Sequence, residues 1–350
     1  MRNDFKKEKK ILKEAIEKWN LNLSNLTILT EAASGNYIFT PIIAAMAGGM
    51  VYALTKDSIY STAKEVKKET LFLAKKFNVS KNIKILENYL PEKIISEVDI
   101  ITNLGFLRPI GKKIISRLKK TAAISLMWET WEFREKDLDL RLCWQRDISV
   151  LGTDESHPRL RTLDYLNKLI FKKISEIGIK KISGLKIVVL AENGFGSYIA
   201  KGFKNRGAKV FRKINNIKET RIFIIAFHED SKIVIGKEGI LTATKLKKLA
   251  PNTLIVQISG SGIISRKDLD RVGIPYIPKK TVKPHFMSWT LNDLGFLPLV
   301  ELHTAGLRVG EVLTRARIKG LSRKEAEDEA LKKSPAQDFS KKQKDQYAIK

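Results

Sequence analysis

The sequence predicts an α/β protein built from two Rossmann-like domains with mostly parallel sheets. The first observation is that short apolar runs alternate with amphipathic stretches along nearly the whole chain, as in parallel sheets with crossover helices. The second is the stretch from Leu185 to Phe211, which reads strand, glycine turn, helix and strand. The third is the length of 350 residues, which leaves room for two domains of ordinary size.

In the first half, the apolar spacing predicts a helix over residues 4–19. Thr40 is suited to cap a second helix with Pro41 at its first position, and Ser61 to cap a third that ends near Phe77. A fourth helix is expected from Pro109 to Lys120. Strands are expected at residues 26–29, 50–54, 83–86, 98–102, 122–128 and 147–152.

A long amphipathic helix, from about Arg159 to Ile177, is expected to join the two halves. Ser322 and Glu325 form a capping pair that opens a charged helix ending near Lys332, and the last residues, DFSKKQKDQYAIK, read as a loose tail. Strands are expected at residues 185–190, 208–211, 221–227, 253–258 and 274–277, and further helices at 242–249, 266–272 and from 299 onward.

The glycine turn is the best candidate for a cofactor site, because a helix that follows such a turn offers free backbone N–H groups to a phosphate. Counted back from Gly207, Gly196 takes the third glycine position of the dinucleotide-binding pattern. The first two positions fall on Ala191 and Asn193, and Asn tolerates a positive φ better than most residues. The expected cofactor contacts here are Asn193, Gly194, Phe195, Gly196 and Ser197.

The second strand of this unit ends in Arg212 and Lys213, where many NAD-binding proteins place an acidic residue for the ribose hydroxyls. Two cations at this place suit a 2′-phosphate, so the sequence favours NADP over NAD while leaving both open. The alternative is a Rossmann-type domain that binds no cofactor.

The amino-acid composition limits the cellular compartment and the partners that we expect for this protein. No run of 18 apolar residues occurs, and the charged N-terminus lacks the apolar core of a signal peptide. The single cysteine, Cys143, excludes an intrachain disulfide and fits a reducing cytoplasm. The net charge is +27, but the lysines are spread over most helices without a basic block or an RNA-binding motif. We therefore expect a solvated basic surface, neither a membrane nor a nucleic acid as partner, and a cytoplasmic location.

Three stretches of the second half resemble the cofactor domain of D-isomer-specific 2-hydroxyacid dehydrogenases, the formate/glycerate dehydrogenase group. They are the glycine-turn unit, the run IIAFHEDSKIVIGKEGILTATKLKKLAPNTLIVQISGSGIISRKDL, and KPHF. The last resembles the family's Pro-His, which would place the catalytic histidine on His285. Ser259, at the end of the second stretch's strand, is a further expected cofactor contact.

This resemblance implies two Rossmann-like domains with a C-terminal helix that returns to the first domain. The expected domains are residues 1–156 with about 290–350, and residues 157–289. The chain departs from the family at its substrate-binding arginine, because QISGSG places Gly260 near that position. The glutamate that partners the family's histidine has no evident counterpart.

The first half holds two further candidates for acid/base chemistry. His157 lies in TDESHP beside two carboxylates, although these residues are also typical of a helix start. Glu129 and Glu132 follow an expected strand, where ligands of open α/β sheets bind. Trp128 and Trp131 could exclude water there and raise a carboxyl pKa, or could simply pack a domain interface.

Three other groups of residues combine side chains that could bind a ligand, hold a metal or react. The segment TEAASGNY, with Glu31 and Gly35, follows a strand and could bind an anion or a sugar hydroxyl, or form a turn. Glu301 and His303 lack a third ligand, so no metal site is expected. Cys143 has no evident activating base and is expected to be buried.

Two functions of different class follow. The first is an NAD(P)-dependent oxidoreductase-like protein that acts on a small carbonyl or hydroxy metabolite in a cleft between the domains, with a homodimer left open. The alternative is a non-redox nucleotide- or metabolite-binding protein on a dehydrogenase-like scaffold with degenerate catalytic residues.

Overall fold

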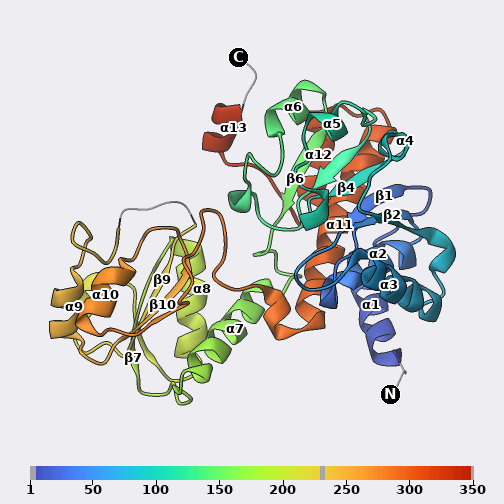
Figure 1. Cartoon of the computed structure of the whole chain (residues 1–350). Helices are drawn as coiled ribbons and strands as arrows, with labels where there is room; N and C mark the ends of the chain where they lie inside the picture. The colour runs from blue at the N-terminus through green and yellow to red at the C-terminus, as the bar shows by residue number, and fades with distance from the viewer. Residues whose placement is uncertain (1–4, 229–232, 348–350) are drawn as a thin grey trace. The chain divides into compact units, whose positions relative to one another are not determined.

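The computed structural model describes residues 5–228 and 233–347, except for the side chain of Asn193. The chain divides into two compact units (Figure 1). Unit 1 is Met1–Thr162 with Gly295–Lys350, and unit 2 is Leu163–Leu294. The expected α/β class, with two mostly parallel sheets, is confirmed.

Unit 1 is built on a sheet of seven described strands in the order β12-β6-β5-β4-β1-β2-β3. All neighbouring strands are parallel except β12, which runs antiparallel to β6. The strands are β1 (Thr27–Glu31), β2 (Met50–Thr55), β3 (Ile83–Glu87), β4 (Ile100–Thr102), β5 (Ala123–Ser125), β6 (Ser149–Thr153) and β12 (Ala336–Gln337).

Helices cover both faces of this sheet. They are α1 (Lys6–Trp19), α2 (Phe39–Met46), α3 (Ala63–Lys76), α4 (Glu92–Ile95), α5 (Lys112–Ile115), α6 (Leu140–Gln145), α11 (Phe296–Ile318), α12 (Arg323–Lys333) and α13 (Lys341–Tyr347). Both α3 and α12 begin with a full capping box, at Thr62 with Glu65 and at Ser322 with Glu325.

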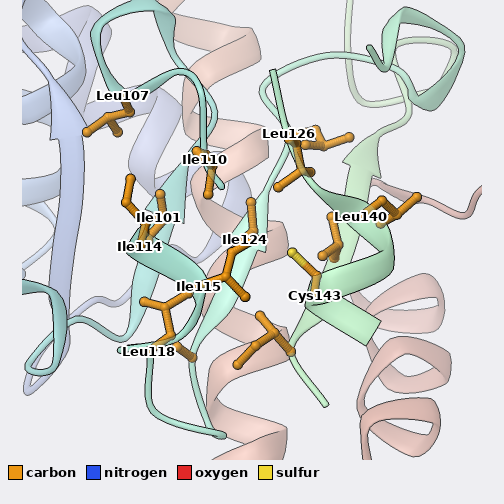
Figure 2. Packing of buried hydrophobic residues seen from close by; sticks show 14 of the residues in the cluster. Ile101, Leu107, Ile110, Ile114, Ile115, Leu118, Ile124, Leu126, Leu140 and Cys143 are labelled. Atoms are coloured by element: carbon orange, nitrogen blue, oxygen red, sulfur yellow. The ribbon is translucent and has the colours of Figure 1, made fainter. Parts of the chain in front are cut away.

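The core of unit 1 forms where alternating strand residues meet these helices. On one face, Ile101 and Ile124 pack with Ile115 and Cys143, as Figure 2 shows. Cys143 is fully buried, as expected, and burial raises the pKa of its thiol. On the other face, Leu151 packs against residues of α11 and α12.

The long helix α11 belongs to unit 1, so the expected return of the C-terminal segment to the first domain is confirmed. Small residues let it approach the sheet closely. A Cβ atom on Gly310 would lie 2.7 Å from Cγ2 of Ile100 and 3.3 Å from Cβ of Ser125. The helix backbone therefore rests directly on β4 and β5.

Unit 2 is a sheet of five described strands, all parallel, in the order β11-β10-β9-β7-β8. The strands are β7 (Lys186–Ala191), β8 (Lys209–Phe211), β9 (Ile222–Ala226), β10 (Leu254–Ser259) and β11 (Tyr276–Ile277). The helices are α7 (Thr162–Glu176), which begins with the last residue of unit 1, α8 (Asn193–Lys204), α9 (Ala243–Leu249) and α10 (Arg266–Val272).

Each face of the unit 2 sheet carries its own core. Val188 and Phe223 point to the side of α9 and α10, and their neighbours Ile187 and Ile222 point to the side of α7 and α8. Figure 1 shows these helices on opposite sides of the strands. Burial on both faces explains why the strands read as continuous apolar runs.

Several sequence expectations were wrong in detail. The helix expected from Pro109 to Lys120 is reduced to the single turn of α5. Thr40 does not cap a helix, because it lies inside α2. Thr62, not Ser61, caps α3. The tail expected after residue 337 contains α13, and its Tyr347 and Phe339 pack on Phe133.

Within the described residues, no helix combines the length and the hydrophobicity needed to cross a membrane.

We expect Gly310→Val to lower the free energy of unfolding by about 2 kcal/mol, because the added methyl groups must displace Ile100 in a packed core. Urea unfolding monitored by circular dichroism measures this. Gly111→Ser is the matched control, since a Cβ there meets no atom within 4 Å. Equal stability of the two variants would show that α11 does not need this close approach.

Candidate functional site

The strand order identifies a candidate ligand-binding position at the carboxyl edge of the unit 2 sheet. The chain runs from β7 to β8 on one side and then to β9 on the other side of β7. The chain therefore leaves β7 in one direction along the sheet and leaves β9 in the opposite direction. The carboxyl ends of these two strands form the switch point, where ligands of open α/β sheets bind. The helix α8 begins at this point, directly after β7.

The amino end of α8 offers a small, partly open surface. Gly194 is exposed, and a Cβ atom there would meet no atom within 4 Å. Gly196 is buried, and its N–H already donates to the carbonyl of Glu192 at 2.8 Å. Ser197 is exposed in the same turn. The backbone could accept an anion at Gly194 without rearrangement of a side chain.

Arg212, the first residue after β8, lies across this helix end. One guanidinium nitrogen donates to Oγ of Ser197 at 2.9 Å, and the other lies 3.3 Å from the carbonyl oxygen of Ala191. A Cβ atom on Gly196 would lie 2.5 Å from Nη2 of Arg212. Glycine is therefore required at position 196 to admit the guanidinium.

The remaining predicted contacts of unit 2 are more scattered. Lys213 is exposed next to Arg212. Ser259 ends β10 and is paired with Ala226 of β9, and its buried Oγ has no hydrogen-bond partner within the described residues. The backbone of Asn193 begins α8, and the structure does not describe its side chain.

His285 lies in the loop after β11 with a positive φ of 59°. Three residues later, Ser288 returns to the end of β10, where its N–H donates to the carbonyl of Ile258 at 2.8 Å. The half-buried imidazole is thus carried by a loop that is attached to the carboxyl edge of the unit 2 sheet. Gly260 follows β10 with a φ of 89°, where the resembled family has its arginine.

Sequence reasoning missed two residues at the switch point. Glu192 follows β7, and its Oε1 accepts the backbone N–H of His228 at 2.7 Å. The imidazole of His228 lies 4.5 Å from the Phe195 ring, measured between centroids. Their positions after the two central strands are the signal that could have revealed them.

In unit 1, the corresponding switch point lies between β1 and β4. Glu31, at the end of β1, is buried and accepts the N–H of Phe106 at 2.8 Å. Burial raises the pKa of this carboxyl, and the hydrogen bond and Arg108 oppose that shift. In the segment TEAASGNY, the Glu31 carboxyl is therefore buried at the carboxyl edge of the unit 1 sheet.

Glu129 lies further along the same edge and is firmly held. Its Oε2 accepts from Nε1 of Trp131 at 2.9 Å, and its Oε1 accepts from Nε2 of Gln337 in β12 at 3.1 Å. Burial raises the pKa of Glu129, and these hydrogen bonds work against the increase. A carboxylate fixed by two donors is a suitable proton acceptor.

Two further carboxyl groups lie close to Glu129. Burial and then the Glu129 charge raise the pKa of Glu132 to about 8. Burial, followed by Glu129 and Glu132, raises the pKa of Glu155 well above its usual range. The three groups therefore share fewer than three negative charges at neutral pH.

Two arginines near this carboxyl cluster pack on the ring of Trp128. The guanidinium carbons of Arg108 and Arg134 lie 4.9 Å and 5.5 Å from the centre of the Trp128 ring. Both arginines also contact Asp137, with Nη1 of Arg108 at 3.2 Å from its carboxylate. The tryptophan thus packs between charged groups within unit 1.

His157 is separate from these groups. Its ring lies 5.3 Å from that of Trp19, and its Nδ1 accepts the N–H of Arg159 at 3.2 Å. Burial lowers the pKa of His157, and Asp154 opposes this shift. The residue stabilises the turn before α7, where the helix begins at Thr162 and not at Arg159.

Glu301 and His303 lie inside α11. Glu301 pairs with Arg161, and Nδ1 of His303 lies 2.7 Å from Oγ1 of Thr40. Burial lowers the pKa of His303 to about 4, so its imidazole is neutral. Across the described parts of the chain, no group of three or more His, Cys, Asp or Glu side chains is arranged to hold a metal ion.

Comparison with known proteins supports the fold. No family model and no curated protein sequence matches the chain. The solved structure of a dipicolinate synthase chain from Bacillus subtilis is similar, with a TM-score of 0.53 at 14% identity, over 86% of this chain and 98% of that one. The structure of a dipicolinate synthase chain from Bacillus halodurans gives 0.53 at 10% identity, over 84% and 98%.

A cofactor (NAD+)-bound 3-phosphoglycerate dehydrogenase from Entamoeba histolytica gives a TM-score of 0.45 at 14% identity, over 85% of this chain and 97% of that one. With TM-scores of 0.53 and identities of 14% or less, the two dipicolinate synthase chains show a likeness of fold alone.

We expect the stability of unit 1 to fall as the pH rises from about 4.5 to 8, because the unfolded chain ionises Glu132 at its ordinary pKa and the folded chain only near pH 8. The full shift corresponds to nearly 5 kcal/mol, and since the side chain keeps some contact with solvent we expect about 2 kcal/mol. Urea unfolding across this pH range measures the loss.

Glu132→Gln should remove most of this slope and make the protein more stable than the wild type at about pH 8.5. Glu14→Gln, on the exposed face of α1, is the control. If wild type and Glu132→Gln lose stability in parallel, the carboxyl cluster does not hold the extra protons.

Proposed function

We propose that unit 2 binds NADP, or less tightly NAD, at the amino end of α8, and that the chain is an oxidoreductase acting on a small carbonyl or hydroxy compound. One observation carries the proposal. Arg212 follows β8 and lies across the first turn of α8, within reach of Ser197. In nucleotide-binding units of this topology, that position faces the ribose next to the adenine.

The residues at this helix end fit a phosphate-bearing ligand. The exposed Gly194 leaves room for the ligand to approach the backbone. The helix dipole and the free N–H groups attract an anion. The guanidinium of Arg212 can form paired hydrogen bonds to a phosphate, and exposed Lys213 adds a second positive charge.

The nicotinamide of such a cofactor supplies or accepts a hydride, and the protein has to supply or accept the accompanying proton. We assign that proton to His285, whose loop is attached to the end of β10. Glu129, fixed beside the protonated Glu132, is the alternative in unit 1. His157 suits the task less well, because its Nδ1 already accepts an N–H group.

A second candidate is a non-redox protein that binds a nucleotide or an anionic metabolite on the same scaffold. Ala191 and Asn193 replace two glycines of the dinucleotide pattern, and the Glu192 carboxylate lies at the switch point. No arginine occupies the substrate position near Gly260. These departures favour binding without hydride transfer.

Titration with NADPH and NADH, followed by nucleotide fluorescence, tests the cofactor assignment. We expect both to bind, with NADPH tighter. Arg212→Ala should weaken NADPH about tenfold to hundredfold, because a charged hydrogen bond to the 2′-phosphate is lost, and should change NADH much less.

Lys209→Ala, an exposed cation at the start of β8, is the matched control and should leave both affinities unchanged. Equal losses for NADPH and NADH in Arg212→Ala would contradict the 2′-phosphate assignment. The absence of saturable binding by either nucleotide would remove the proposal.

Turnover separates the two candidate functions. With NADPH and a panel of small 2-oxo acids, we expect measurable oxidation of the nucleotide. His285→Gln should then lower kcat by about a hundredfold or more while the Kd for NADPH stays nearly constant. Glu129→Gln tests the alternative proton donor in the same assay. Tight nucleotide binding without turnover on any substrate would favour the non-redox candidate.

A further inference from the structure

His228 and Glu192 flank the switch point of unit 2 from two neighbouring strands. Glu192 follows the end of β7, and His228 lies two residues beyond the end of β9. The two strands pair in parallel up to Ala191 and Ala226. Both side chains therefore lie at the edge of the sheet where α8 begins.

Contacts with the first turn of α8 fix the imidazole. The Glu192 carboxylate accepts the backbone N–H of His228 through Oε1, and its Oε2 lies 4.0 Å from Nδ1 of the ring. Phe195, in the first turn of α8, packs against the same ring at a centroid distance of 4.5 Å. The half-buried imidazole is thus held next to the N–H groups that open the helix.

The charge at this place depends on one proton. With a neutral imidazole, the negative charge of the Glu192 carboxylate opposes the approach of a second anion, and Arg212, which lies across the same helix end, offsets part of that charge. With an imidazolium, the pair is neutral, and the ring N–H becomes a charged donor next to the helix dipole. A phosphate is therefore accepted much better when His228 carries a proton.

Two effects on His228 oppose each other. Burial lowers the pKa of the imidazole, and the Glu192 carboxylate raises it. A bound diphosphate adds negative charge to the same place and favours the protonated form further. By linkage, a ligand that favours protonation is itself bound more tightly by the protonated protein.

We propose that His228 is a phosphate-binding residue of the nucleotide site, that it takes up a proton when the anionic ligand binds, and that Glu192 is its positioning residue. This inference rests on the proposed nucleotide site at α8 and does not depend on hydride transfer. It names a diphosphate-bearing nucleotide as the ligand class, and it explains how a carboxylate can stand at the amino end of α8 without excluding such a ligand.

Isothermal titration calorimetry with ADP-ribose tests the proposal on the full chain. This ligand is suitable because its diphosphate keeps the same charge between about pH 6 and pH 8.5, whereas the 2′-phosphate of NADP titrates near pH 6. We expect binding to weaken about tenfold over this range. Titrations in buffers with different heats of ionisation should show net proton uptake near neutral pH.

Three variants test whether His228 and Glu192 cause the dependence of binding on pH. His228→Gln should bind ADP-ribose with the affinity of the wild type at high pH, and with no pH dependence. Glu192→Gln should bind more tightly at about pH 8.5, because the repulsion is gone, and the NMR titration of the His228 ring should move to lower pH. His157→Gln, in unit 1, should keep the wild-type dependence on pH.

The outcomes separate this inference from the function on which it rests. Binding of ADP-ribose with the same affinity at all pH values and without proton uptake would overturn the role of His228 and leave the nucleotide site intact. If NADPH, NADH and ADP-ribose all fail to bind between about pH 6 and pH 8.5, the nucleotide site and the role of His228 both fall. Because proton uptake is measured on the wild type, poor folding of a variant does not obscure the answer.

Discussion

The parallel arrangement of the strands determines where polar side chains can gather in each unit. Parallel strands all end at the same edge of a sheet, so the residues after them are brought together whatever their distance in the sequence. In unit 2 this edge collects Glu192, Arg212 and His228 around the start of α8. In unit 1 it collects Glu31 and the cluster around Glu129. The backbone topology sets the position of both sites, and the side chains then decide their chemistry.

The two groups of residues differ in electrostatic character. The helix end in unit 2 carries Arg212 and a carboxylate whose effect depends on a neighbouring imidazole, so its charge suits an anionic ligand. The cluster in unit 1 keeps protons on Glu132 and Glu155. Hydrogen bonds from Trp131 and Gln337 hold Glu129 in place. This cluster is therefore better suited to exchanging protons than to binding a charged ligand. The oxidoreductase function proposed above would require both properties, anion binding and proton exchange.

Much of the fold could be predicted because its signals are local. The apolar run Ile187–Leu190 and the capping pair at Ser322 identify their elements without tertiary information. The expected helix after Pro109 is shorter because the chain turns at Ser116 to pack Leu118 into the core. Arg212 could be proposed as a candidate cofactor contact from the sequence because it directly follows the next strand of the same unit. The contact between His228 and Glu192 could not be predicted, although each residue follows an expected strand, because it spans 36 positions and depends on β9 pairing with β7.

The assignment of α11 and β12 to unit 1 has a consequence for biosynthesis. Unit 2 is a continuous segment, Leu163–Leu294, inserted between the two segments of unit 1. On the ribosome, every residue of unit 2 emerges before Gly310 can pack on β4 and before Gln337 can reach Glu129. The face of the unit 1 sheet that α11 covers must therefore stay uncovered until the residues of α11 have been synthesised. During that interval the nascent chain exposes apolar surface of the kind that chaperones bind.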